Sequence, residues 1–172
     1  LPLEQVQELL ESGIHTHRMI ALVILTLQYK NNKEKIYDIY LKNTKYINNW
    51  DLVDVTAHKI VGEYLLDKPR DVLYDLAKSN DLWEKRISII STFAFIRRGQ
   101  LDDAIKISEI LLHDKHDLIH KAVGWMLREV GKKDKQVLIN FLDKYSKEMP
   151  RTMLRYSIER FSSEERQHYM KK

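Results

Sequence analysis

The sequence contains no cysteine, and this absence excludes disulfides, thiolate metal sites and cysteine nucleophiles. Glycine and proline are scarce, with five and three residues among 172, which argues against a turn-rich β-sandwich and favours helices. The strongest apolar runs, residues 19–27 and 87–96, are much shorter than the roughly 18 residues that suggest a membrane span. The first residues carry no secretory signal pattern. We therefore expect a cytoplasmic protein without a membrane partner.

Charges of both signs are abundant and nearly balanced. The 29 lysines and arginines exceed the 25 aspartates and glutamates, which gives a formal net charge of +4. So mild an excess permits a polyanionic partner without requiring one. The positions of the cations along the chain therefore matter more than their number.

Glycine, proline and capping residues divide the chain into helical segments at regular intervals. No segment shows sustained alternation with a period of two, so the sequence predicts no strand and an all-α fold. The expected helices cover residues 3–12, 15–30, 34–46, 50–65, 69–79, 82–98, 101–113, 117–130, 134–148 and 150–161.

These helices fall into pairs with short turns, as expected for a helical repeat. The second members begin near residues 15, 50, 82, 117 and 150, and their spacing of about 34 residues is typical of stacked helical hairpins. The tetratricopeptide signature is missing, which favours HEAT-like units. We therefore predict an α-solenoid of about five HEAT-like hairpins, forming one repeat domain over residues 1–172.

A column of charged residues recurs with the repeat period on the second helices. Its members are Arg18, Asp54, Arg86, Lys121 and Arg155, and Arg128 lies close by. Equivalent positions of stacked repeats line one surface, so this column predicts a concave basic groove suited to a phosphate backbone. The alternative is a solvated face with scattered intrahelical ion pairs.

Asp54 is the one acid of this column. A carboxylate surrounded by cations is expected to stay ionised. It could stabilise a positive charge that develops on a bound molecule. Alternatively, it could form a neutralising ion pair with Arg18 or Arg86.

The three tryptophans all lie beside this column. Trp50 is four residues before Asp54 and Trp125 is four after Lys121, so both indoles share the face of the column. Their π-faces attract cations, and two indoles around a carboxylate would suit a flat, positively charged ligand. Trp83 is expected to belong to the core.

Two further features have structural explanations. Gly62 and Gly124 lie inside expected helices, where we expect close helix packing to require them. His113, His116 and His120 have a spacing that can suit zinc. They fall at an expected interhelix loop and no cysteine or further histidine joins them, so no metal site is predicted.

Several elements resemble those of the DNA alkylation repair glycosylases of the AlkD type. The segment 49–54 is similar to the family's Trp-Asp-x-x-Asp element, and the segments 83–86, 124–129 and 149–156 are similar to later elements in the same order. The resemblance covers nearly the whole chain. Family members carry a further helical segment on the N-terminal side, so it also implies that these helices are missing here.

The resemblance implies a HEAT-like solenoid that binds duplex DNA and removes N3- and N7-alkylated purines by cleaving the N-glycosidic bond. Asp54 matches the catalytic acidic residue, Trp50 and Trp125 match the aromatic residues that contact the lesion, and Arg86 matches a cleft arginine at the DNA backbone. No cofactor or metal is implied, and a monomer is expected. The alternative is a non-catalytic HEAT-repeat scaffold that binds DNA structures or a protein through an apolar stripe.

Overall fold

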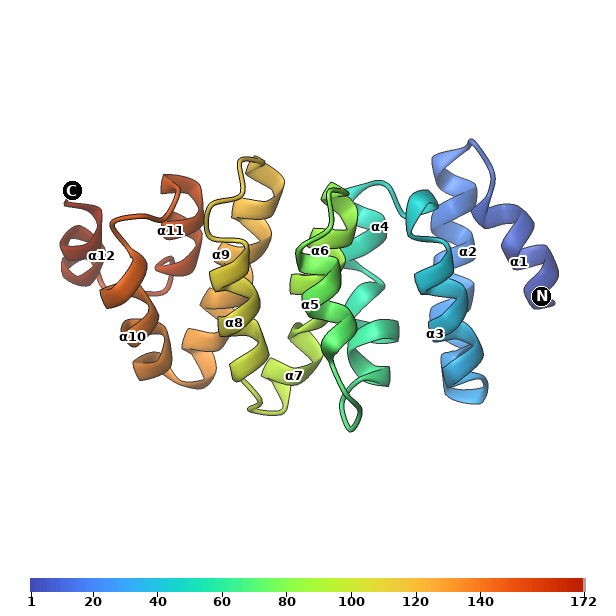
Figure 1. Cartoon of the computed structure of the whole chain (residues 1–172), viewed down its shortest axis with the longest axis horizontal. Coiled ribbons are helices and arrows are strands. Elements are labelled where there is room, and N and C mark those ends of the chain that lie inside the picture. Colours follow the sequence, from blue (N-terminus) through green and yellow to red (C-terminus); the bar gives the residue numbers. More distant parts are fainter. Residues whose placement is uncertain (172) are drawn as a thin grey trace.

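A computed structural model describes residues 1–171, and within that range the chain forms helices and no strands. The helices stack as hairpins into an elongated row, with the N-terminus at one end and the C-terminus at the other (Figure 1). The α-helices are α1 (Leu3–Leu10), α2 (His15–Gln28), α3 (Lys33–Lys42), α4 (Trp50–Asp54), α5 (Asp71–Ala77), α6 (Leu82–Ser91), α7 (Phe93–Arg97), α8 (Asp102–Ile110), α9 (Asp117–Lys133), α10 (Lys135–Tyr145), α11 (Arg151–Ser157) and α12 (Ser163–Met170). Short 3₁₀ segments η1 (Tyr29–Asn31) and η2 (Thr44–Tyr46) and a π-helical turn η3 (His58–Gly62) join them. The all-α prediction is confirmed.

The second helices α2, α4, α6, α9 and α11 begin within one residue of the predicted starts. Local capping explains this agreement. The Asn49 side chain accepts a hydrogen bond from the Trp50 amide at 2.8 Å, and Asp81 accepts from the amides of Trp83 and Glu84 at 2.7 and 3.1 Å. Such caps satisfy amides that have no partner within the helix, so they fix where a helix begins.

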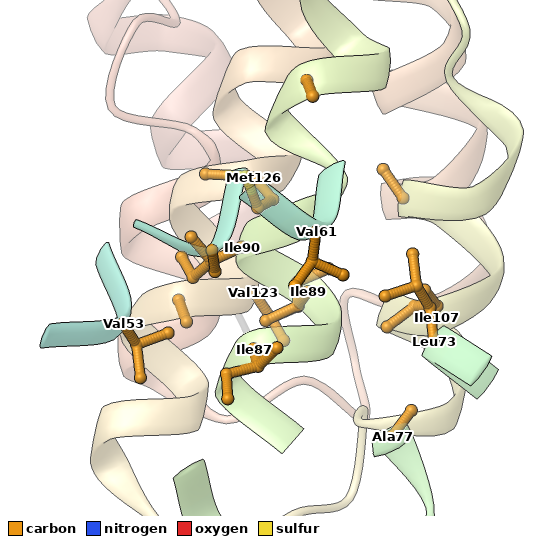
Figure 2. Close-up of a cluster of buried hydrophobic side chains, with 14 of the residues drawn as sticks. Val53, Val61, Leu73, Ala77, Ile87, Ile89, Ile90, Ile107, Val123 and Met126 are labelled. Atoms are coloured by element: carbon orange, nitrogen blue, oxygen red, sulfur yellow. The ribbon is translucent and has the colours of Figure 1, made fainter. Parts of the chain in front are cut away.

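Helix α6 lies in the middle of the row and packs deep in the core. Helices α4, α5, α8 and α9 and the turn η3 all contact α6, and its isoleucines interdigitate with Val53, Val61 and Met126 (Figure 2). Every residue from 86 to 91 is buried. Because Arg86 is among these buried residues, its charge has to be paired inside the protein.

Two predicted second helices are interrupted, which corrects the continuous helices expected over 50–65 and 82–98. The Thr56 hydroxyl donates to the Leu52 carbonyl at 2.5 Å, and the Thr92 hydroxyl donates to that of Ile89 at 2.6 Å. Hydroxyl groups that bond to the preceding turn compete with the backbone ladder and bend helices. Asp54 consequently ends α4 rather than lying in mid-helix.

Helix α12 lies beyond the last predicted helix, so the sequence prediction missed it. It begins with a capping box, in which the Ser162 side chain accepts from the Glu165 amide and the Glu165 carboxylate accepts from the Ser162 amide. This pattern was a signal that could have found it. The Tyr169 hydroxyl donates to Asp143 of α10 at 2.8 Å, which holds α12 against the last hairpin.

The two mid-helix glycines lie where helices cross closely, and this confirms the expected reason for them. A Cβ atom at Gly62 would overlap the Ser91 carbonyl oxygen and lie 2.7 Å from the Ala94 side chain. One at Gly124 would lie 2.5 Å from the Tyr156 Cβ and 2.7 Å from the Met153 carbonyl oxygen. Helices α9 and α11 can approach to this distance only because residue 124 has no side chain.

We predict that Gly124→Ala lowers the free energy of unfolding by about 1–3 kcal/mol, because overpacking outweighs the helix propensity of alanine. Urea denaturation measures this change. Gly13→Ala is the matched control, since nothing lies within 4 Å of its added Cβ. Equal stabilities of the two variants would contradict the close crossing of α9 and α11.

Candidate active site

Four successive second helices contribute to one open pocket. It has a volume of about 380 Å³, and its lining residues are Trp50, Asp54, Arg86, Leu118, Lys121, Trp125, Arg128 and Tyr156. They come from α4, α6, α9 and α11. Positions that are equivalent in the repeat thus meet on one surface, as the charge column required.

Asp54 and Arg86 form a bidentate ion pair within this pocket. The Arg86 Nε donates to Asp54 Oδ1 and its Nη2 to Asp54 Oδ2, both at 2.8 Å, and its Nη1 donates to the Leu118 carbonyl. The side chains are 15% and 6% exposed for Asp54 and Arg86. The ion pair that the sequence left as an alternative is therefore present. Arg86 faces Asp54 instead of solvent, and its contact with a DNA backbone stays a prediction.

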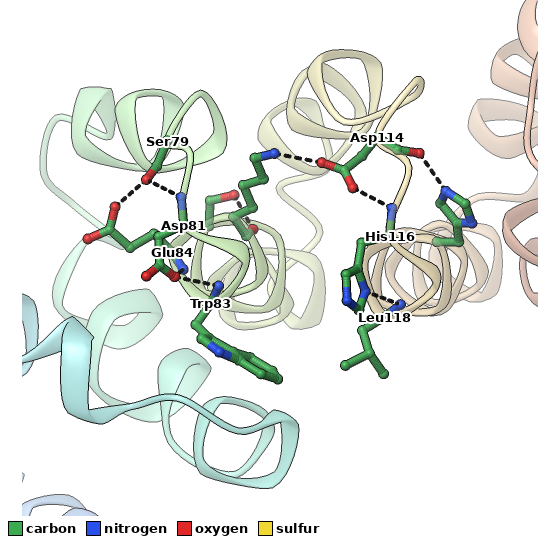
Figure 3. Close-up of polar contacts among 10 residues, drawn as sticks. Ser79, Asp81, Trp83, Glu84, Asp114, His116 and Leu118 are labelled. Atoms are coloured by element: carbon green, nitrogen blue, oxygen red, sulfur yellow. Dashed lines mark hydrogen bonds and ion pairs between the residues drawn. The ribbon is translucent and has the colours of Figure 1, made fainter.

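Polar contacts hold the start of α9 (Figure 3). The Leu118 carbonyl in this first turn accepts the bond from Arg86. The His116 ring accepts from the Leu118 amide at 3.1 Å, and Asp114 accepts from the His116 amide and from Lys85 of α6, both at 2.8 Å. Burial would raise the pKa of Asp114, but the bonds from Lys85 and the His116 amide lower it below its usual value. The Lys85–Asp114 bridge therefore ties α6 to the loop that precedes α9.

The two pocket tryptophans have different environments. Trp50 is 54% exposed, although a large aromatic side chain gains by burial. Trp125 packs against the core and lies 6.0 Å from Phe93 between ring centroids. Trp83 also packs on the core, as predicted, and lies outside this pocket.

His58 lies one turn after Asp54 and contacts Phe93, the same ring that packs against Trp125. Its ring contacts Phe93 edge-on at 5.4 Å. Burial, with the nearby charges of Lys59 and Arg97, lowers the pKa of His58 below its usual value. The lowered pKa favours the neutral imidazole, so His58 adds no positive charge beside Asp54 and Arg86.

The remaining predicted cations divide into two groups. Lys121 and Arg128 line the pocket, and each is paired: Lys121 with Asp117 at 2.8 Å and Arg128 with Glu159. The hydrogen bond from Lys121 to Asp117 raises the pKa of Lys121, so this ammonium stays charged at the pocket rim. For Lys121 the structure therefore shows the alternative that the sequence left open, a solvent-exposed ion pair within one helix.

Two members of the predicted column lie outside the pocket. The Arg18 guanidinium donates to the Ser12 carbonyl at 2.9 Å, beside the turn between α1 and α2. Arg155 lines a neighbouring pocket instead. Tyr156 also lines the pocket and was not predicted from the sequence. Its place beside Arg155 on a second helix was the available signal.

No group of three histidine, cysteine, aspartate or glutamate side chains in residues 1–171 could hold a metal ion. His113 pairs with Glu148 at 3.5 Å and the His120 ring bonds the Asp114 carbonyl. No helix within the same range is long and apolar enough to cross a membrane.

The sequence of this helical protein matches a known protein family. Residues 2–161 match the family of DNA alkylation repair enzymes. Because the match covers most of the sequence, the chain belongs to this family. A search of curated proteins found no match. The family relation makes the protein a DNA repair enzyme acting on alkylation damage, with DNA as its substrate.

The buried ion pair generates a stability prediction. Arg86→Ala or Asp54→Ala alone should lower the free energy of unfolding by about 3 kcal/mol, because each leaves a buried charge unpaired. The double variant should lose at least about 1 kcal/mol less than the sum of the two. Urea denaturation of all four proteins gives this coupling.

The exposed pair of Arg98 and Glu63 is the control, with side chains 46% and 31% exposed. Its coupling should stay below about 1 kcal/mol. Equal coupling energies for the two pairs would contradict the buried role of Arg86.

Proposed function

We propose that the protein is a DNA glycosylase that hydrolyses the N-glycosidic bond of cationic N3- and N7-alkylated purines in duplex DNA. The observation that carries this proposal is a carboxylate, Asp54, held by Arg86 in an open pocket between two indoles. The family relation supports DNA alkylation repair in general. The step to this reaction rests on the chemistry of these side chains.

Alkylation at N3 or N7 gives the purine a formal positive charge and makes it a good leaving group. The base therefore departs with the bonding electrons and needs no general acid. Positive charge then moves to the deoxyribose ring as an oxocarbenium ion, and a fixed carboxylate stabilises charge where it develops. Water adds to C1′, losing a proton to Asp54 or solvent, and leaves an abasic site.

Arg86 acts as a positioning residue in this mechanism. Two parallel hydrogen bonds fix the plane of the Asp54 carboxylate. The third bond, to the Leu118 carbonyl, fixes the guanidinium itself. A carboxylate held in this way needs no reorganisation when the sugar becomes cationic, and such preorganisation is a large part of enzymatic electrostatics.

The indoles suit the same cationic intermediate. A cation over an indole face is attracted by about 0.5–2 kcal/mol, depending on its desolvation. Trp50 and Trp125 flank the pocket that contains Asp54, so both the alkylated base and the sugar can meet a π-face. An open pocket of about 380 Å³ favours catalysis at a surface over capture of a base in a deep cavity.

The cations at the pocket rim suit duplex DNA. Lys121 and Arg128 line the pocket, and Arg155 lies next to it. Backbone phosphates compete for such side chains and release counterions. We propose a monomer in which a single HEAT-like domain presents this surface, with Arg18 as a further contact and with Arg86 kept in its ion pair with Asp54.

We predict that Asp54→Asn lowers excision of 7-methylguanine at least about 100-fold, since it removes the charge that stabilises the transition state. DNA affinity should stay equal or rise slightly. The assay is release of the base from a methylated duplex oligonucleotide in a single turnover.

Asp51→Asn is the matched control for this experiment. Asp51 lies on the same helix and pairs with His15 at 3.0 Å, outside the pocket. The same loss of charge there should leave excision within about threefold of the wild type. Excision at the wild-type rate by Asp54→Asn would contradict the assignment of Asp54 as the catalytic carboxylate.

A scaffold function is the second candidate, and one observation favours it. Helix α2 exposes an apolar stripe of Ile20, Val23 and Leu27, which are 44%, 42% and 76% exposed. Such a stripe suits a protein partner. The stripe lies outside the Asp54 pocket. Leu27→Lys should therefore abolish partner binding if the protein is a scaffold, and should leave base excision unchanged if it is a glycosylase.

A further inference from the structure

A second open pocket adjoins the Asp54 pocket between α11 and α12. It has a volume of about 540 Å³, and its lining residues are Arg155, Tyr156, Ile158, Glu159, Arg166 and Met170. Tyr156 lines both pockets, so the two hollows are neighbours on the surface. Arg128 of the first pocket pairs with Glu159 of the second, and this ion pair forms part of their shared wall.

The second pocket carries two cations without a protein partner. Arg155 and Arg166 are exposed, and neither guanidinium hydrogen-bonds or pairs with another residue in the described part of the chain. Four other arginines each pair with a carboxylate, namely Arg70, Arg86, Arg98 and Arg128. Because Arg128 engages Glu159, the positive charge over this pocket is uncompensated.

Apolar groups complete the pocket. Its wall includes Ile158, Met170 and the ring of Tyr156, which is 37% exposed. Guanidinium groups bind phosphate oxygens in a bidentate manner. Aromatic side chains stack on nucleobases of any identity. The combination of two free arginines with an aromatic and apolar wall therefore fits a nucleotide.

We propose that this pocket is a second nucleotide subsite. It holds a nucleotide that flanks the lesion, with its phosphate on Arg155 and Arg166 and its base stacked on Tyr156. This proposal rests on the proposed function, since the DNA that occupies the Asp54 pocket supplies the flanking nucleotide. The subsite draws one neighbouring nucleotide out of the helical stack and so fixes the register of the duplex over Asp54.

The first test compares Arg166→Ala with Arg160→Ala in the whole chain. Arg160 is also exposed but lines neither pocket, so its loss removes the same charge from outside the subsite. Fluorescence anisotropy of an undamaged duplex oligonucleotide is titrated at several salt concentrations. Arg166→Ala should bind about fivefold more weakly and lose about one phosphate contact from the salt dependence. Arg160→Ala should match the wild type, and equal losses in the two variants would overturn the subsite.

The second test reports the position of the nucleotide. A 2-aminopurine base placed at each step beside the lesion becomes more fluorescent when it leaves the stack. The wild type should raise this signal at one flanking step, and Arg166→Ala should abolish the rise. No rise at any step would overturn the proposal. Both readouts are binding measurements, so they remain decisive if Asp54→Asn disproves the glycosidic reaction.

Discussion

The arrangement of the pocket depends on one interaction, the ion pair between Asp54 and Arg86. Arg86 lies in the buried part of α6. Its charge is tolerated there only because Asp54 and the Leu118 carbonyl accept its hydrogen bonds and compensate it. These three groups come from α4, α6 and α9. A single buried guanidinium thus links three successive repeats and fixes the orientation of the carboxylate.

The backbone around this pair is adapted to it. Thr56 ends the regular part of the second helix shortly after Asp54, where its hydroxyl bonds the preceding turn and the Tyr40 hydroxyl at 2.9 Å. Gly124 lets α11 approach α9, which brings Tyr156 to the pocket beside Trp125. Both features weaken a helix locally. Thr56 and Gly124 are nevertheless explained by the pocket surface that they help to form.

The starts of the second helices could be predicted from sequence because caps such as Asn49 and Asp81 act locally. The shared surface of Asp54, Lys121 and Trp125 followed from the repeat period. The burial of Arg86 could not be predicted, since it depends on how α6 packs against its neighbours. The place of Arg155 beyond the pocket, and the helix break at Thr56, likewise depend on tertiary contacts.

The central claim is that a carboxylate held by an arginine cleaves the bond between a cationic purine and its sugar. Chromatography of the products from a duplex that carries one 7-methylguanine tests it most directly. The account predicts that wild-type protein releases free 7-methylguanine and leaves an intact strand with one abasic site. Binding of this duplex with no free base released would contradict the account and favour a scaffold.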